Sequence, residues 1–80
     1  MSEYTQKSIE SFFSDYNVTD PDLKAKLLPE LTDIIYDYNM HIVNLEKETD
    51  EYKRNQIMVG IKELRDKIDE IFSDNLKSTK

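Results

Sequence analysis

Two apolar stripes constrain this 80-residue chain more than any other feature. Both follow the 4, 3, 4, 3 residue spacing that is typical of a helix with one apolar face. The first stripe consists of Leu31, Ile35, Tyr38, Ile42 and Leu45. The second consists of Ile57, Ile61, Leu64, Ile68 and Ile71. Because helical spacing dominates and alternating β-type stretches are lacking, the sequence predicts an all-α fold.

The segment between the stripes, residues 44–56, decides whether they belong to one helix or to two. Continuing the first stripe in register would place polar residues such as Thr49 and Gln56 at core positions. The second stripe instead restarts twelve residues after Leu45, out of register with the first. We therefore predict a turn at residues 47–50, with Thr49 as the N-cap of the following helix.

One continuous helix is the alternative, because this segment contains neither Gly nor Pro. It also contains Lys47 with Glu51 and Asp50 with Arg54, two oppositely charged pairs at i,i+4. Such a helix of about fifty residues would be about 80 Å long and could not bury its own stripe. It would need a coiled-coil partner, whereas a hairpin could close a core with one further helix.

Capping signals predict where the first two helices begin and end. The first is expected at about residues 3–16, with Ser2 as N-cap, and it should end at Asn17. The second should begin after Asp20, whose carboxylate can accept from free amides, with Pro21 at the first helical position.

Pro29 predicts a kink or a short break in the second helix, which we place at about residues 21–47. A third helix is expected at about residues 50–76, followed by a frayed tail at 77–80. The prediction is one helical domain spanning residues 1–80: a small three-helix bundle built on a long antiparallel helical hairpin. A dimeric coiled coil is the alternative.

The charge of the chain limits the partners that it can bind. Its net charge is -6 at pH 7, which opposes direct nucleic-acid binding because affinity for phosphates comes from Lys and Arg. Residues 1–37 hold eight acidic and three basic side chains, so most of the excess lies in the first half. Both a solubilising surface and a contact with a basic protein surface explain this excess.

Cysteine is absent and no segment approaches about 18 continuous apolar residues, so the sequence supports neither disulfides nor a membrane span. The first residues also lack the pattern of an export signal. We therefore expect a cytoplasmic chain.

His41 is the only histidine, and it shares a predicted helix face with Asp33 and Asp37 at i,i+4 intervals. A metal site normally needs further histidine or thiolate ligands, so we expect no metal and no cofactor. No nucleophile motif or Gly-rich phosphate loop is present either. The sequence therefore predicts a protein that is not an enzyme and has no catalytic residues.

Four residues of the second helix form the first candidate contact site. Asp33, Tyr36, Asp37 and Met40 share one helix face, giving an acidic patch with an aromatic and apolar centre. Tyrosine is enriched in protein interfaces because it buries a large area and keeps a polar tip. Ordinary packing at the core margin is the alternative interpretation of the tyrosines.

Met58, Val59 and Gly60 form the second candidate site, in an apolar band wider than a single stripe. Glycine inside a helix costs about 1 kcal/mol relative to alanine, which suggests that Gly60 permits a close backbone approach. Methionine adapts to irregular partner surfaces. We consider these residues a docking surface for another helix, with core packing as the alternative.

These observations favour a non-enzymatic protein-binding regulator, such as an adaptor, an inhibitor, or an immunity-type or chaperone-type protein. It would act through an acidic helical surface on another protein, with a homodimer as an additional expectation. A structural coiled-coil subunit and a nucleic-acid mimic that blocks a DNA-binding protein are the two alternatives.

Overall fold

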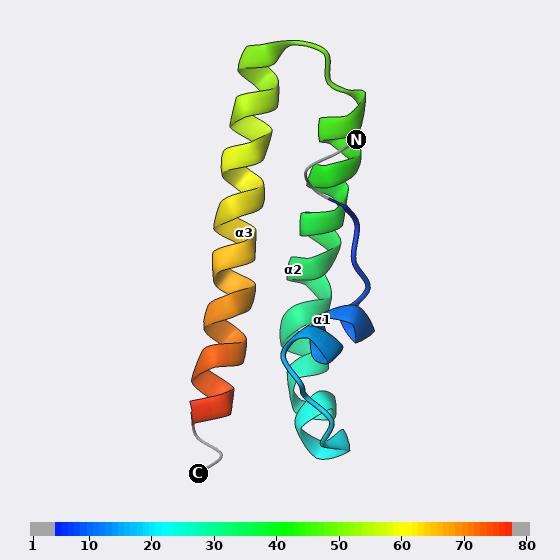
Figure 1. The fold of residues 1–80 in the computed structure, drawn as a ribbon, viewed down its shortest axis with the longest axis vertical. Helices are drawn as coiled ribbons and strands as arrows, with labels where there is room; N and C mark the ends of the chain where they lie inside the picture. The colour runs from blue at the N-terminus through cyan, green and yellow to red at the C-terminus, as the bar shows by residue number, and fades with distance from the viewer. Residues whose placement is uncertain (1–4, 78–80) are drawn as a thin grey trace.

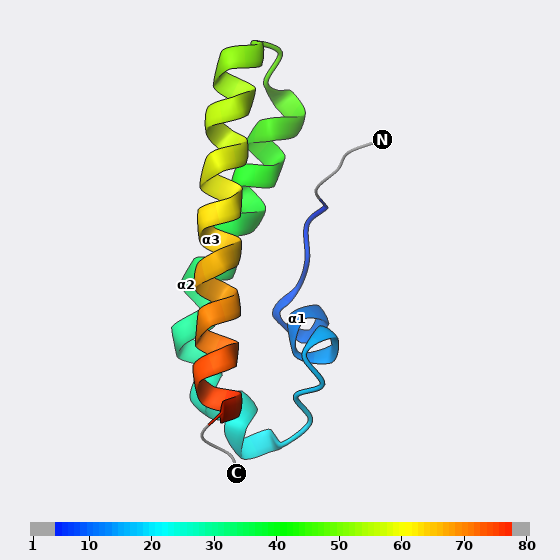
Figure 2. The same cartoon turned by 60° about the vertical axis from the view of Figure 1, so that its left-hand side comes forward.

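The computed structural model describes residues 5–77, and the predictions for residues 1–4 and 78–80 lie outside this range. The described residues form three helices, α1 (Ile9–Asp15), α2 (Pro21–Lys47) and α3 (Glu51–Lys77), and no strand. Helices α2 and α3 pack as an antiparallel hairpin, and α1 lies beside them near the end opposite the turn (Figures 1 and 2). The molecule measures 46 × 20 × 18 Å. This confirms the all-α fold and the bundle built on a hairpin.

The turn between α2 and α3 lies at residues 48–50, so the alternative of one continuous helix is wrong. The N-cap of α3 is Asp50 and not Thr49, because the Asp50 Oδ2 accepts a hydrogen bond from the Lys53 amide at 3.1 Å. The Asp50 amide in turn donates to the Glu48 carboxylate at 3.1 Å. An aspartate at this position satisfies a free amide of the first turn and places negative charge at the positive end of the helix.

Arg54 ties the start of α3 to the end of α2. Its Nη1 donates to the carbonyl oxygens of Leu45 at 2.6 Å and of Glu48 at 3.0 Å. The last carbonyls of a helix lack intrahelical donors, and a cation there also interacts favourably with the helix dipole. The guanidinium therefore stabilises the turn, although the sequence had suggested a pairing with Asp50 that favours a continuous helix.

Helix α1 is shorter than predicted because the chain before it is hydrogen-bonded to α2. It begins at Ile9, with Ser8 as N-cap. The Lys7 amide donates to the Asn39 side-chain oxygen at 2.9 Å, and the Asn39 amide group donates back to the Lys7 carbonyl at 2.7 Å. These bonds hold the backbone outside the helix, so the predicted start near residue 3 is wrong for residues 5–8. The Ser2 cap lies outside the described residues.

The end of α1 at Asn17 was predicted correctly. Asn17 has a positive φ of 59°, a conformation that asparagine adopts more readily than most residues. The Val18 amide donates to the Phe13 carbonyl at 2.8 Å, and the Asn17 amide donates to the Ser14 carbonyl at 3.1 Å. This is the Schellman pattern, and the buried Val18 supplies its usual hydrophobic contact.

The bounds of α2 also agree with the prediction, since it starts at Pro21 after the N-cap Asp20. The helix continues through Pro29, so the expected short break is absent. Pro29 is on the exposed side, where water can satisfy the carbonyl that loses its amide donor. Leu27 and Leu31 on either side of it are fully buried, and their packing offsets the missing hydrogen bond.

Both predicted stripes face the interior of the bundle. Every residue of the first stripe is buried, whereas Ile57, Leu64 and Ile71 of the second are only partly buried. Residues of α1 complete the core, in which the side chains of Phe12 and Phe13 are each 1% exposed. The buried core consists of Phe12, Phe13, Val18, Leu27, Leu31, Ile35, Tyr38, Ile42, Leu45, Ile61, Ile68 and Phe72.

Aromatic rings attach α1 to the hairpin. Phe12 meets Tyr38 of α2 edge-on, with ring centroids 5.7 Å apart. Phe13 meets Phe72 of α3 in the same way at 5.9 Å, and Tyr16 stacks on Phe72 at 4.2 Å. Such ring pairs stabilise beyond the area that they bury, so the short helix is held by side chains that reach both long helices.

Candidate functional site

The predicted patch on α2 lies on one exposed face of the helix. Asp33, Tyr36, Asp37 and Met40 are all exposed, and the side chains of Tyr36 and Met40 are 65% and 39% exposed. Their i, i+3, i+4, i+7 spacing makes them neighbours on the helix surface. The structure therefore brings these four residues together.

An apolar row extends this patch toward the start of α2. Leu28, Thr32, Tyr36 and Met40 follow each other at i,i+4 steps, and we call this row the apolar ridge. Leu28 is 45% exposed, and the Thr32 hydroxyl donates to the Leu28 carbonyl at 2.6 Å. The sequence did not lead us to predict Leu28 and Thr32 as part of this site, although both precede Tyr36 at i,i+4 spacing. Of the five large apolar side chains that are exposed within residues 5–77, three lie on the apolar ridge.

A second row runs beside the apolar ridge and carries negative charge. It contains Asp33 and Asp37, and we call these two residues the acidic row. From residue 27 to residue 46, α2 carries four carboxylates and neither Lys nor Arg. Among the described side chains, neither Asp33 nor Asp37 forms an ion pair. The negative potential of this face is therefore not neutralised by nearby cations of α2.

A shallow, mainly apolar groove separates the apolar ridge from the segment that precedes α1. The reciprocal hydrogen bonds between Asn39 and Lys7 hold this segment against α2. These bonds engage both polar atoms of the Asn39 side chain, so its amide group does not need water in the groove as a hydrogen-bond partner. The lining residues are Ser8, Ile9, Thr32, Ile35, Tyr36 and Asn39.

The second predicted group does not form one surface. Met58 packs against the core, Val59 is 57% exposed, and Gly60 faces α2. Successive residues of a helix point about 100° apart, which explains why three neighbours in sequence separate in space. A Cβ atom on Gly60 would lie 3.0 Å from Cδ2 of the His41 ring. The close approach that glycine permits is thus made by α2 of the same chain.

His41 takes part in this helix contact. Its Nδ1 lies 2.8 Å from the Asp37 carbonyl oxygen, which can only accept, so Nδ1 carries the proton in this bond. Its Nε2 lies 3.1 Å from the position of a Cβ on Gly60. In the part of the chain that the structure describes, no group of three or more His, Cys, Asp or Glu residues is arranged to hold a metal ion.

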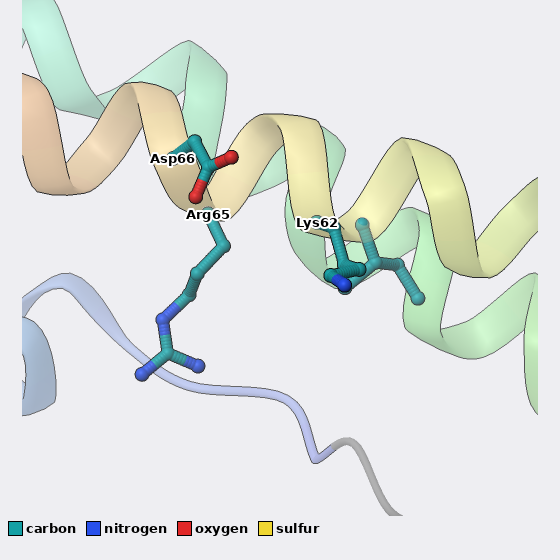
Figure 3. Close-up of a pocket in the computed structure, with 4 residues that line it drawn as sticks. Lys62, Arg65 and Asp66 are labelled. Atoms are coloured by element: carbon teal, nitrogen blue, oxygen red, sulfur yellow. The ribbon is translucent and has the colours of Figure 1, made fainter.

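A second hollow lies on α3, lined by Ile61, Lys62, Arg65 and Asp66 (Figure 3). Arg65 extends from α3 on the side where the segment before α1 passes (Figure 3). Its Nη1 donates to the hydroxyl of the buried Tyr38 at 3.5 Å. The guanidinium thus links α3 to α2, and the hollow offers no nucleophile paired with a base.

Tyr16 makes the corresponding link between α1 and α3. Its hydroxyl donates to the Asp69 carboxylate at 2.6 Å. Burial, together with the hydrogen bond and the negative charge of Asp69, raises the pKa of Tyr16 from 10.0 to about 12. The neutral phenol is therefore the form that holds the two helices together.

Comparison of the chain with models of protein families, with curated proteins and with solved structures finds no match. None of the helices, as far as they are described, combines the length and the hydrophobicity of a membrane span. The exposed face of α2 is therefore interpreted from its own chemistry.

Proposed function

We propose that this chain is a non-enzymatic protein-binding regulator of the adaptor, inhibitor, immunity or chaperone type. In this proposal, it acts through the exposed face of α2. The observation that supports the proposal is the 65% exposure of Tyr36, which lies beside the acidic row and one turn before Met40 on the apolar ridge. Exposed apolar side chains that gather on one face mark interaction sites more often than scattered ones do, and tyrosine is enriched among the residues that dominate binding energy.

The charge of this face favours a partner with a basic surface. Negative potential attracts a cationic protein over several ångströms and raises its association rate, most strongly at low salt. A symmetric homodimer through the same face would place the acidic row of one copy near that of the other. Such like-charge contacts oppose binding, so a different protein is the better partner for this face.

The other two candidate functions find less support. A coiled-coil subunit needs free apolar stripes, whereas the whole first stripe and Ile61 and Ile68 of the second are buried within one chain. A nucleic-acid mimic needs spaced negative charge, and the apolar ridge next to the acidic row has no counterpart in a phosphate backbone.

Site-directed photo-crosslinking tests the proposal. A benzoylphenylalanine at position 36 should capture a defined protein in cells of the native host. The same group at position 52 should not, although Tyr52 is 70% exposed and is therefore a matched control. The purified Tyr36→Ala variant should lose that protein, and Tyr52→Ala should retain it.

Equal capture from positions 36 and 52, or no capture from position 36, contradicts the proposal. Loss of the partner in both alanine variants contradicts it as well.

A further inference from the structure

We infer that the element bound by α2 is a basic amphipathic helix of the partner. Its apolar residues would pack on the apolar ridge, and its Lys or Arg residues would lie over the acidic row. The inference rests on the proposed function and specifies the chemistry and shape of the partner. Three features of the described residues support it: the geometry of the ridge, the satisfied polar groups around it and the unpaired carboxylates beside it.

The geometry of the apolar ridge favours a helix. Rows at i,i+4 steps are the ridges by which helices pack into each other's grooves, most often at a crossing angle of about -50°. The stripe side of α2 already packs on α3, and α1 with the segment before it covers one flank. The apolar ridge is the row of α2 that has large exposed side chains, and no helix within residues 5–77 covers them. Its span from residue 28 to residue 40 offers about three turns of contact.

The polar groups around the ridge do not oppose an apolar contact. Burying a polar group costs free energy unless its hydrogen bonds are made. The Thr32 hydroxyl already donates to the Leu28 carbonyl, and the Asn39 side chain already pairs with Lys7. Met40 at the end of the row can adapt its shape to a partner. An apolar helix face can therefore cover this area without leaving these groups unsatisfied.

The acidic row sets the charge of the partner. Asp33 and Asp37 lie one row away from Tyr36 and form no ion pair with a described side chain. A helix with an apolar row and an adjacent Lys or Arg row at i,i+4 steps matches both rows at once. Desolvating these carboxylates without a cation nearby would cost free energy, so the same match excludes an acidic helix.

The test uses the full chain and three labelled 18-residue probes, with binding followed by fluorescence anisotropy. The first probe is an idealised amphipathic Leu/Lys helix, and the second replaces every Lys by Glu. The third has the Leu/Lys composition with two central prolines that prevent a helix. We expect the first probe to bind, and the other two to bind at least about tenfold more weakly.

Matched variants of the chain show where the Leu/Lys probe binds. Asp33→Asn with Asp37→Asn should weaken binding of the Leu/Lys probe by about tenfold or more, and Tyr36→Ala should do the same. Glu63→Gln with Glu70→Gln removes the same charge from an exposed part of α3, and it should change the affinity less than about twofold. Tyr52→Ala should also leave it nearly unchanged. Circular dichroism verifies that each variant is folded.

Equal weakening by the two charge-removing variants would overturn the inference, because attraction would then depend on net charge alone. Equal binding of the proline-containing probe would also overturn it, in favour of an extended segment. If position 36 crosslinks a protein while the Leu/Lys probe shows no dependence on Asp33, Tyr36 or Asp37, the inference fails and the proposed function stands. If position 36 captures nothing and the probe shows no such dependence, both fail.

Discussion

Gly60 lowers the helix propensity of α3 but leaves room for the His41 ring of α2. Alanine would stabilise the interior of α3 by about 1 kcal/mol, but its Cβ would lie 3.0 Å from the His41 ring. The imidazole would have to shift to accommodate a methyl group at this distance. Its hydrogen bond to the Asp37 carbonyl opposes that shift. We therefore predict that Gly60→Ala gives less than the full gain in the wild-type background.

A double-mutant cycle measures this contact. In a His41→Ala background, where the ring is absent, Gly60→Ala should raise the free energy of unfolding by the full amount of about 1 kcal/mol. Urea denaturation of the four proteins gives the coupling between the two positions. Equal effects of Gly60→Ala in both backgrounds would show that the ring and the glycine do not interact.

Arg54 links the start of α3 to the carbonyl groups on the other side of the turn. Arg54→Ala removes two hydrogen bonds to carbonyls at the end of α2, and hydrogen bonds from charged groups are stronger than neutral ones. We predict a loss of about 1–2 kcal/mol in the free energy of unfolding, measured by urea denaturation. Lys53→Ala is the control, because that side chain is exposed, and it should change stability by less than about 0.5 kcal/mol. Similar losses in both variants would contradict the role of Arg54.

At the scale of elements, the sequence predicted those helix ends that depend on neighbouring residues in the chain. The start of α2 follows from Asp20 and Pro21, and the end of α1 follows from the left-handed conformation of Asn17. The start of α1 did not follow, because Asn39 holds Lys7 from 32 residues away in sequence. A sequence pattern contains no information on such a tertiary bond.

The same distinction applies to the candidate site. Asp33, Tyr36, Asp37 and Met40 are related by helical spacing alone, and a helix sufficed to bring them together. The surroundings of Gly60 depend on which residue of α2 lies opposite it. That register is determined by the turn and by packing across the hairpin, so sequence reasoning detected the close approach without identifying His41.

The contact between α1 and α3 should be sensitive to alkaline pH. The pKa of Tyr16 is about 12 in the folded protein against 10.0 for the free side chain, so the folded state holds the phenolic proton more tightly. Its stabilising contribution is fully present below pH 10 and is lost as the pH rises toward about 12. The free energy of unfolding of the wild type should fall more steeply over this interval than that of Tyr16→Phe. Urea denaturation at several pH values measures both slopes, and identical slopes would contradict the prediction.

At the scale of the whole molecule, the hairpin and α1 close a core within one chain. The whole first stripe and Ile61 and Ile68 of the second are buried, and a net charge of -6 opposes self-association. We therefore expect a monomer of 9.5 kDa in sedimentation equilibrium at micromolar concentration. A mass of twice that value, unchanged on dilution, would contradict this expectation and would support the homodimer.

The close ring contacts are concentrated at one end of the bundle. Phe12 and Phe13 of α1 and its C-cap Tyr16 account for all three ring contacts found among residues 5–77, whereas Tyr36 and Tyr52 are exposed. The near-ultraviolet circular dichroism of this tryptophan-free chain therefore reports mainly on the docking of α1. The far-ultraviolet signal comes mostly from the two long helices. Recording both bands during one melt separates release of the short helix from unfolding of the hairpin without any attached label.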